Sequence, residues 1–132
     1  VLRLKKIISV DGGKQIRPNV NLKDIIRVLD HFLFSKTNFK ENIYNMGFEN
    51  FSILKIAKKI QKKTGARLII NKSIDLRSYR QDSSRLIKTG FKALYTVDDA
   101  IDELIQYFAR KKENNFDNKN FNLKRMQQLN VR

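Results

Sequence analysis

The sequence predicts a small α/β fold in which helices and short strands are mixed within one domain. Apolar residues recur at helical spacing in three separate segments. Short β-prone runs, bounded by glycine and asparagine, stand between them. The chain has 132 residues, of which 41% are hydrophobic. It is therefore long enough for one domain with a core and too short for two of ordinary size.

The first part of the chain is predicted to be extended. Ile7 to Val10 alternate weakly and lead into Asp11-Gly12-Gly13, a turn whose glycines allow positive φ. Gln15 to Val20 follows as a second extended run, because Pro18 disfavours helix in the residue before it.

Two helices with a strand between them are predicted next. Asn21 is a good N-cap for a first helix that runs to about Ser35. Asn42 to Gly47 is predicted to be a short strand. Ser52 then opens a second helix, which Thr64-Gly65 closes as a glycine C-cap. The apolar faces of the two helices are Leu22, Ile25, Ile26, Leu29, Phe32 and Leu33 in the first, and Ile53, Ile56, Ala57 and Ile60 in the second.

A second short strand is predicted at Arg67 to Asn71. The order helix, strand, helix, strand favours a small parallel pairing. Beyond it, Asp82 is expected to cap a short helix from Ser83 to Lys88, which Gly90 ends.

The last long helix is predicted from Val97 to about Lys111. It begins at a sequence that is typical of a capping box, Thr96 with Asp99 three residues later, in which Asp replaces the usual Glu. The main domain is expected to span residues 1–113.

Residues 114–132 are rich in asparagine and have no period, which indicates a polar C-terminal tail. We expect this tail to lie over the body through Phe116 and Phe121, with a short helix at Leu123 to Leu129.

The composition excludes several classes of site. The chain has no cysteine and one histidine, His31, so it cannot make a thiolate or His-cluster metal site by itself. Its longest apolar stretches, such as Leu68 to Ile70, are far shorter than the roughly 20 residues of a membrane span. These features predict a cytoplasmic protein without a membrane partner. The start at Val1 suggests that the chain is processed or is a piece of something longer.

The net charge is +15, which leaves three interpretations open. Much of the excess is lysine scattered among asparagine and isoleucine, a pattern typical of drift in an AT-rich genome. An anion-binding site can be embedded in that background. Nucleic-acid binding is the least favoured, because aromatic residues are not interleaved with basic ones on any predicted face.

Three stretches carry a recognisable pattern in order and spacing. They are Gly12 to Asp24, Ile43 to Ala57, and Ile74 to Phe91 followed by Thr96 to Leu104. Together they resemble the C-terminal, substrate-binding portion of the extended short-chain dehydrogenases/reductases, the NAD-dependent nucleotide-sugar epimerases and dehydratases. The resemblance covers about residues 7–121.

The resemblance implies a set of residues that bind a nucleoside diphosphate sugar. Arg17 matches the arginine that reaches the pyrophosphate, a role that suits the planar fork of a guanidinium. Arg77, and after it Arg80, match the second arginine on the phosphates, although an ion pair of Arg80 with Asp75 or Asp82 is an alternative. Ile53 matches the position that packs on the nucleotide base.

Asn19 and Asn21 are also candidate substrate-binding residues, but there the sequence departs from the family. An aromatic residue is common at the first position, and His or Tyr is usual at the second. The sugar and the base are therefore not implied.

The dinucleotide site and the catalytic pair of that family have no match here. No glycine fingerprint opens a strand-turn-helix unit, so this chain is not expected to bind a cofactor alone. Tyr107 and Lys111 have the spacing of the family's Tyr-x-x-x-Lys pair. They follow the substrate segment instead of preceding Arg17, so we interpret the spacing as coincidental and Tyr107 as packing on or flanking the core. We assign no catalytic residue.

The resemblance implies that NAD(P) and the hydride chemistry belong to an N-terminal Rossmann domain, on the same chain or on a separate one. This chain would bind the nucleoside diphosphate and be inactive alone. The alternative is a stand-alone, non-catalytic module that binds nucleotide sugars or another polyanion.

Overall fold

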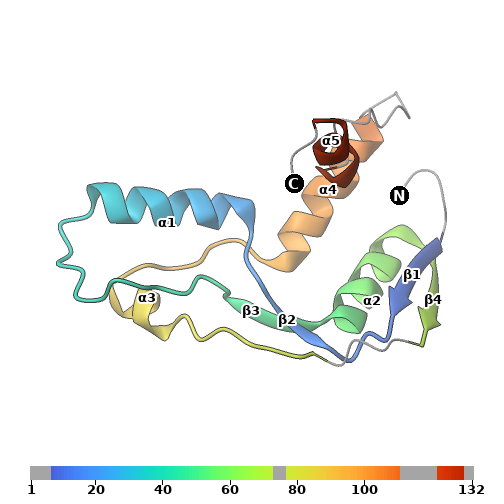
Figure 1. Ribbon diagram of the computed structural model, residues 1–132, viewed down its shortest axis with the longest axis horizontal. Coiled ribbons are helices and arrows are strands. Elements are labelled where there is room, and N and C mark those ends of the chain that lie inside the picture. The colour runs from blue at the N-terminus through green and yellow to red at the C-terminus, as the bar shows by residue number, and fades with distance from the viewer. Residues whose placement is uncertain (1–6, 73–76, 111–121, 130–132) are drawn as a thin grey trace.

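The computed structural model describes residues 7–72, 77–110 and 122–129. Within them it is a small mixed α/β fold with two two-stranded sheets and five helices. Figure 1 shows an elongated arrangement, with α1 and α3 toward one end, α2, β1 and β4 toward the other, and β2 and β3 between them. In chain order the elements are β1 (Ile7–Asp11), β2 (Ile16–Asn19), α1 (Leu22–Phe34), β3 (Glu49–Ser52), α2 (Ile53–Thr64), β4 (Arg67–Asn71), α3 (Ser84–Lys88), α4 (Val97–Arg110) and α5 (Asn122–Gln128).

One sheet is the parallel pair β1–β4, in which Ile7 lies opposite Arg67. Helix α2 packs on it, and the residues buried there are Val10, Ala57 and Ala66. Gly13 lets the chain pass close to α2, because it has a φ of 95° and a Cβ at this position would lie 3.0 Å from Leu54 Cβ. A parallel pair is therefore present, but the partner of β4 is β1 and not the strand that the sequence predicted at Asn42 to Gly47.

The other sheet corrects a sequence prediction. No strand forms at Asn42 to Gly47, and the strand is β3, which pairs antiparallel with β2. Residues 42–47 do not join the sheet, because Tyr44 and Met46 of this segment pack against the apolar core instead. Gly47 is tightly enclosed, since a Cβ there would lie 2.6 Å from Pro18 Cβ. Pairing with β2 begins at Phe48, whose N–H donates to the carbonyl of Asn19 over 3.0 Å.

The predicted starts of α1 and α2 are confirmed. Asn21 Oδ1 accepts the N–H of Lys23 (3.0 Å), and Ser52 Oγ accepts the N–H of Lys55 (3.2 Å). Helix α3 begins one residue later than predicted, with Ser83 as its N-cap, and Asp82 Oδ1 accepts the N–H of Ser84 (2.8 Å) from the position before that cap. Each first turn leaves N–H groups without helical partners, which these side chains satisfy.

The main apolar core lies between α1, α3 and the segment that follows α3. Its buried members are Val28, Leu86 and Phe91, and partly buried Phe32, Tyr44, Met46 and Phe48 pack around them. The rings of Phe48 and Phe91 are stacked, 5.6 Å between centroids. This core holds the α1 end of the molecule together.

A buried carboxylate joins α1 to the segment before α4. Asp24 is 0% exposed, and its Oδ2 accepts the N–H groups of Leu94 (3.1 Å) and Tyr95 (2.9 Å). Arg27 Nη1 donates to Asp24 Oδ1 over 2.5 Å and to the carbonyl of Lys92 over 2.8 Å. The charge of Asp24 is thus paired and hydrogen-bonded, as a buried charge requires.

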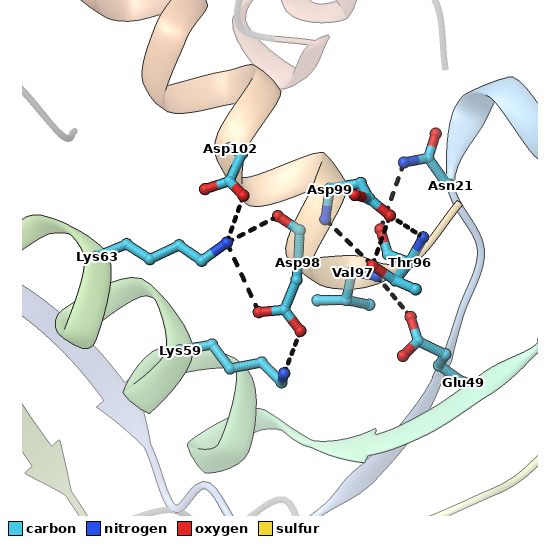
Figure 2. A network of polar contacts seen from close by, with 9 residues as sticks. All are labelled: Asn21, Glu49, Lys59, Lys63, Thr96, Val97, Asp98, Asp99 and Asp102. Atoms are coloured by element: carbon cyan, nitrogen blue, oxygen red, sulfur yellow. Dashed lines mark hydrogen bonds and ion pairs between the residues drawn. The ribbon is translucent and has the colours of Figure 1, made fainter. Parts of the chain in front are cut away.

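The start of α4 is tied to α2 and β3 by the polar network in Figure 2. Thr96 and Asp99 form the predicted capping box: Asp99 Oδ2 accepts the N–H of Thr96 (2.7 Å), and Thr96 Oγ1 accepts the N–H of Asp99 (3.2 Å). Glu49 Oε2 accepts the N–H of Val97 over 2.5 Å. These contacts fix the direction in which α4 leaves the body.

Two lysines of α2 complete that network. Lys59 pairs with Asp98, and Lys63 Nζ lies 2.6 Å from Asp102 Oδ2 and 3.8 Å from Asp98 Oδ1. The hydrogen bond from Lys59 lowers the pKa of Asp98 below its ordinary 3.8. The bonds that Asp99 accepts from the Thr96 side chain and backbone lower its pKa as well.

The lowered pKa values predict acid sensitivity at the start of α4. Because the folded state favours the charged carboxylates, their contribution to stability is present above the unfolded value of 3.8 and is lost as pH falls through the folded values. We expect the free energy of unfolding, measured in guanidinium chloride, to fall between about pH 5 and about pH 2. Asp98→Asn should make that slope shallower, and an equal slope in both proteins would contradict the assignment.

Two predictions about the C-terminal part have different outcomes. A helix is present in the tail, α5, close to the predicted Leu123 to Leu129. The predicted contacts of Phe116 and Phe121 lie outside the described residues.

Candidate functional site

The outer edge of β2 is lined by the segment 77–79. The N–H of Ile16 donates to Ser78 Oγ (2.9 Å), and the N–H of Tyr79 donates to the carbonyl of Ile16 (3.3 Å). The edge of β2 that β3 does not cover is thus paired with residues some 60 positions further along the chain.

This pairing brings the two predicted arginines together. Arg17 Nη1 donates to the carbonyl of Arg77 (2.5 Å) and to that of Ile16 (2.9 Å). The guanidinium also lies over the ring of Tyr79, 4.7 Å from its centroid, in a favourable cation–π arrangement. We call Arg17, Arg77 and Tyr79 the arginine cluster. Because its backbone bonds and the ring hold Arg17 in one place, the guanidinium is pre-organised.

Two further predicted residues adjoin the arginine cluster. Ile53 follows the Ile16–Ser52 pair of the β2–β3 sheet and is half-buried, with its N–H donating to the carbonyl of Gln15 (3.1 Å). Arg80 follows Tyr79 and is exposed. Of its two alternative partners, Asp82 binds Ser84 through both carboxylate oxygens, and Asp75 lies outside the described residues.

The two predicted asparagines have structural contacts. Asn19 Nδ2 donates to the carbonyls of Arg17 (2.8 Å) and Glu49 (3.1 Å), across the β2–β3 pair. Asn21 is 6% exposed; besides capping α1, its Nδ2 donates to the carbonyl of Thr96 over 3.4 Å. Both side chains keep β2 and α1 in position, and Asn21 lies at the contact with α4 rather than in the arginine cluster.

A basic surface that sequence reasoning missed lies next to Arg17. Phe51 is directly opposite Arg17 in the β2–β3 register, so the two side chains share one face of the sheet. Lys55 Nζ lies 3.9 Å from the centroid of the Phe51 ring, and Lys59 Nζ lies 5.5 Å from it. The signal was present in the sequence, because Lys55, Lys59 and Lys63 recur every four residues along one helical face.

A cleft of about 660 Å³ lies elsewhere. It is lined by the apolar Phe48, Ile87 and Phe91 and by the polar Asn50, Gln81 and Asp82, among others. Asn50 alternates with Phe51 along β3, so it belongs to the opposite face of the sheet from Arg17. None of the six predicted substrate residues lines this cleft.

The described residues offer no cradle for a dinucleotide. The one glycine pair that follows a strand, Gly12-Gly13, connects β1 to β2 and not to a helix. A dinucleotide pyrophosphate needs glycines that open onto a helix N-terminus, so this turn does not fit that group. Tyr107 lies on α4, exposed, with its ring 5.2 Å from that of Phe108.

No group of three or more His, Cys, Asp or Glu residues that could hold a metal ion occurs within residues 7–72, 77–110 and 122–129. None of the helices in this described part of the chain combines the length and the apolar character that crossing a membrane requires.

Comparison with known proteins shows the fold. No protein-family model matches the sequence. A solved structure, described as a novel NAD-dependent NDP-hexosamine 5,6-dehydratase, TunA, involved in tunicamycin biosynthesis, is similar over 84% of this chain with a TM-score of 0.70 and 14% sequence identity. The chain spans 38% of the length of that dehydratase. The fold is therefore that of part of a larger enzyme structure.

Proposed function

We propose that this chain is the nucleotide-sugar-binding, C-terminal portion of an NAD-dependent nucleotide-sugar epimerase or dehydratase. Arg17 and Arg77 bind the nucleoside diphosphate, Arg80 adds a further cation, and Ile53 packs on the base. Asn19 and Asn21 act by positioning β2 and α1. An N-terminal Rossmann domain, in the same chain or as a separate one, holds NAD(P) and the catalytic groups.

One observation carries the proposal. Two arginines that are 60 residues apart in the sequence meet at one edge of β2, through the bond from Arg17 Nη1 to the carbonyl of Arg77. Charge-assisted hydrogen bonds from guanidinium groups are well suited to phosphate oxygens. The basic surface at Lys55 adds positive potential beside them.

Binding of this kind contributes to catalysis without touching the reacting bond. Contacts to the diphosphate are remote from the sugar, and their free energy serves to orient the sugar at the reaction centre. Because the chain's own residues supply only this step, we expect the isolated chain to bind and not to turn over.

The test is a calorimetric titration of the chain with UDP-, dTDP- and GDP-sugars and with a single-stranded RNA. We expect one nucleotide sugar to bind with a 1:1 stoichiometry, and its affinity to fall only moderately between about 50 and 200 mM salt, because few phosphates are contacted. RNA binding that is tighter and falls by orders of magnitude over that range would contradict the proposal. Because the proposed contacts are to the diphosphate and the base, free UDP, dTDP or GDP should bind about as tightly as the corresponding nucleotide sugar, and failure of all of them to bind would contradict the proposal.

A further inference from the structure

Helix α1 presents a continuous apolar stripe to solvent. Its members are Leu22, Ile26, Leu29 and Leu33, which are 70%, 54%, 54% and 72% exposed. Spacings of four, three and four residues place them on one side of the helix. The opposite side carries the buried Asp24 and Val28. Helix α1 therefore buries one side in the body and exposes an apolar stripe on the other.

An exposed stripe of this kind is unfavourable in water. Burial of apolar surface stabilises by about 25 cal/mol per Å², and large contiguous apolar patches on soluble proteins mark interaction surfaces. Over 13 residues the helix is about 20 Å long, so the stripe runs along most of one side of this end of the molecule.

We infer that the α1 stripe is the surface on which the dinucleotide-binding domain of the same enzyme docks. This inference rests on the proposed function. The solved dehydratase with this fold is matched over 38% of its chain, so more than half of that structure has no counterpart in these 132 residues. We therefore take a domain of that size as the partner that docks on the α1 stripe.

The position of the stripe relative to the arginine cluster fits this occupant. Leu22 is five residues from Arg17, at most about 17 Å along an extended chain, and the two are joined by β2. A body seated on α1 therefore lies beside the bound nucleotide sugar. The first turn of α1 is also held to the segment before α4, since the buried Asp24 accepts the N–H groups of Leu94 and Tyr95, so the surface offered to the partner is fixed on the body.

A second copy of this chain fits less well. Stable protein interfaces use about 20 to 30 residues on each side, and the α1 stripe has four. A globular domain can extend its contact to the adjoining α4, where Leu104 is exposed, whereas two straight stripes laid on each other reach little beyond their own side chains.

The experiment compares the protein as its host makes it, carrying a C-terminal affinity tag, with the 132-residue chain produced alone. Mass, bound dinucleotide and hydrogen exchange of the amides of residues 25–33 are measured for each. We expect the host protein to exceed 15.6 kDa or to be purified together with a second chain, to contain NAD(H) or NADP(H), and to exchange these amides at least about tenfold more slowly than the isolated chain. In the host protein, Ile26→Glu should raise exchange to the rate of the isolated chain.

Ile43→Glu is the matched control, since Ile43 is 75% exposed and lies outside the stripe; it should leave exchange unchanged. Equal exchange in the host protein, Ile26→Glu and the isolated chain would overturn the inference, and so would a homodimer of the 15.6-kDa chain that Ile26→Glu dissociates. Titration of the isolated, unaltered chain with the nucleotide sugars reports separately on the proposed function. Absence of binding there, with α1 protected in the host protein, would contradict that function and leave the docking surface intact.

Discussion

Replacement of Arg17 by alanine is expected to weaken binding of the nucleoside diphosphate sugar by at least about tenfold. Hydrogen bonds to charged groups contribute about 1.5–3 kcal/mol, and 1.4 kcal/mol corresponds to a factor of ten in Kd. The Arg17 guanidinium is already held by the carbonyls of Ile16 and Arg77, so little conformational entropy opposes its use. Isothermal titration calorimetry with the preferred nucleotide sugar measures the change.

Two variants distinguish specific binding by the Arg17 guanidinium from general attraction of the ligand by positive charge. Arg17→Lys keeps the charge but not the planar fork, so it should restore only part of the affinity. Arg67→Ala removes an exposed arginine from β4, in the other sheet, and should change Kd less than twofold. Equal losses in Arg17→Ala and Arg67→Ala would mean that overall positive charge, and not the arginine cluster, attracts the ligand.

The contribution of Arg77 can be tested without disturbing Arg17. Arg17 binds the backbone carbonyl of Arg77, which Arg77→Ala retains. If both guanidinium groups contact one diphosphate, the losses in the double variant should not be additive. Strict additivity would place the two side chains on different parts of the ligand or one of them off it. Thermal unfolding of each variant shows whether a loss of binding comes from a loss of structure.

Local sequence patterns were sufficient for the helices and insufficient for the sheets. The caps at Asn21, Ser52 and Thr96 were predictable because the bonds that define them join residues two or three positions apart. The strand predicted at Asn42 to Gly47 was wrong because pairing partners are chosen over 30 or more residues. Nothing in the local pattern says that Asn19 lies opposite Glu49.

The candidate site was likewise predictable only where local patterns or family resemblance sufficed, and not where distant segments meet. Arg17 and Arg77 were singled out by family resemblance, and no spacing rule predicts that residues 60 apart meet. Their meeting depends on the segment 77–79 lying along β2. The lysine repeat of α2 predicts a basic helix face that includes Lys55. It does not predict that this face lies beside Arg17, because that depends on Phe51 lying opposite Arg17 across the sheet.

Removal of the Asp24 carboxylate is expected to have the largest effect on stability. An aspartate in the first turn of a helix is usually exposed and interacts favourably with the helix dipole, but the Asp24 side chain is 0% exposed. Asp24→Ala would leave the N–H groups of Leu94 and Tyr95 and the guanidinium of Arg27 without their acceptor. The Arg27 side chain is 34% exposed, so the larger part of the loss comes from the two N–H groups, at about 1–3 kcal/mol for each donor left without an acceptor. We expect a total of about 3–5 kcal/mol, a large fraction of the roughly 5–15 kcal/mol by which domains are stable.

Chemical denaturation of the 132-residue chain measures this loss, and two further variants define its cause. Asp24→Asn keeps one acceptor but not the charge, so it should cost less than alanine, about 1.5–3 kcal/mol. Asp30→Ala removes an exposed carboxylate from the same helix and should change the free energy of unfolding by no more than about 0.5 kcal/mol. If Asp24→Ala and Asp30→Ala were equally mild, the link from α1 to the segment before α4 would be dispensable, and the other contacts of α4, those of Lys59, Lys63 and Glu49 among them, would suffice to hold it.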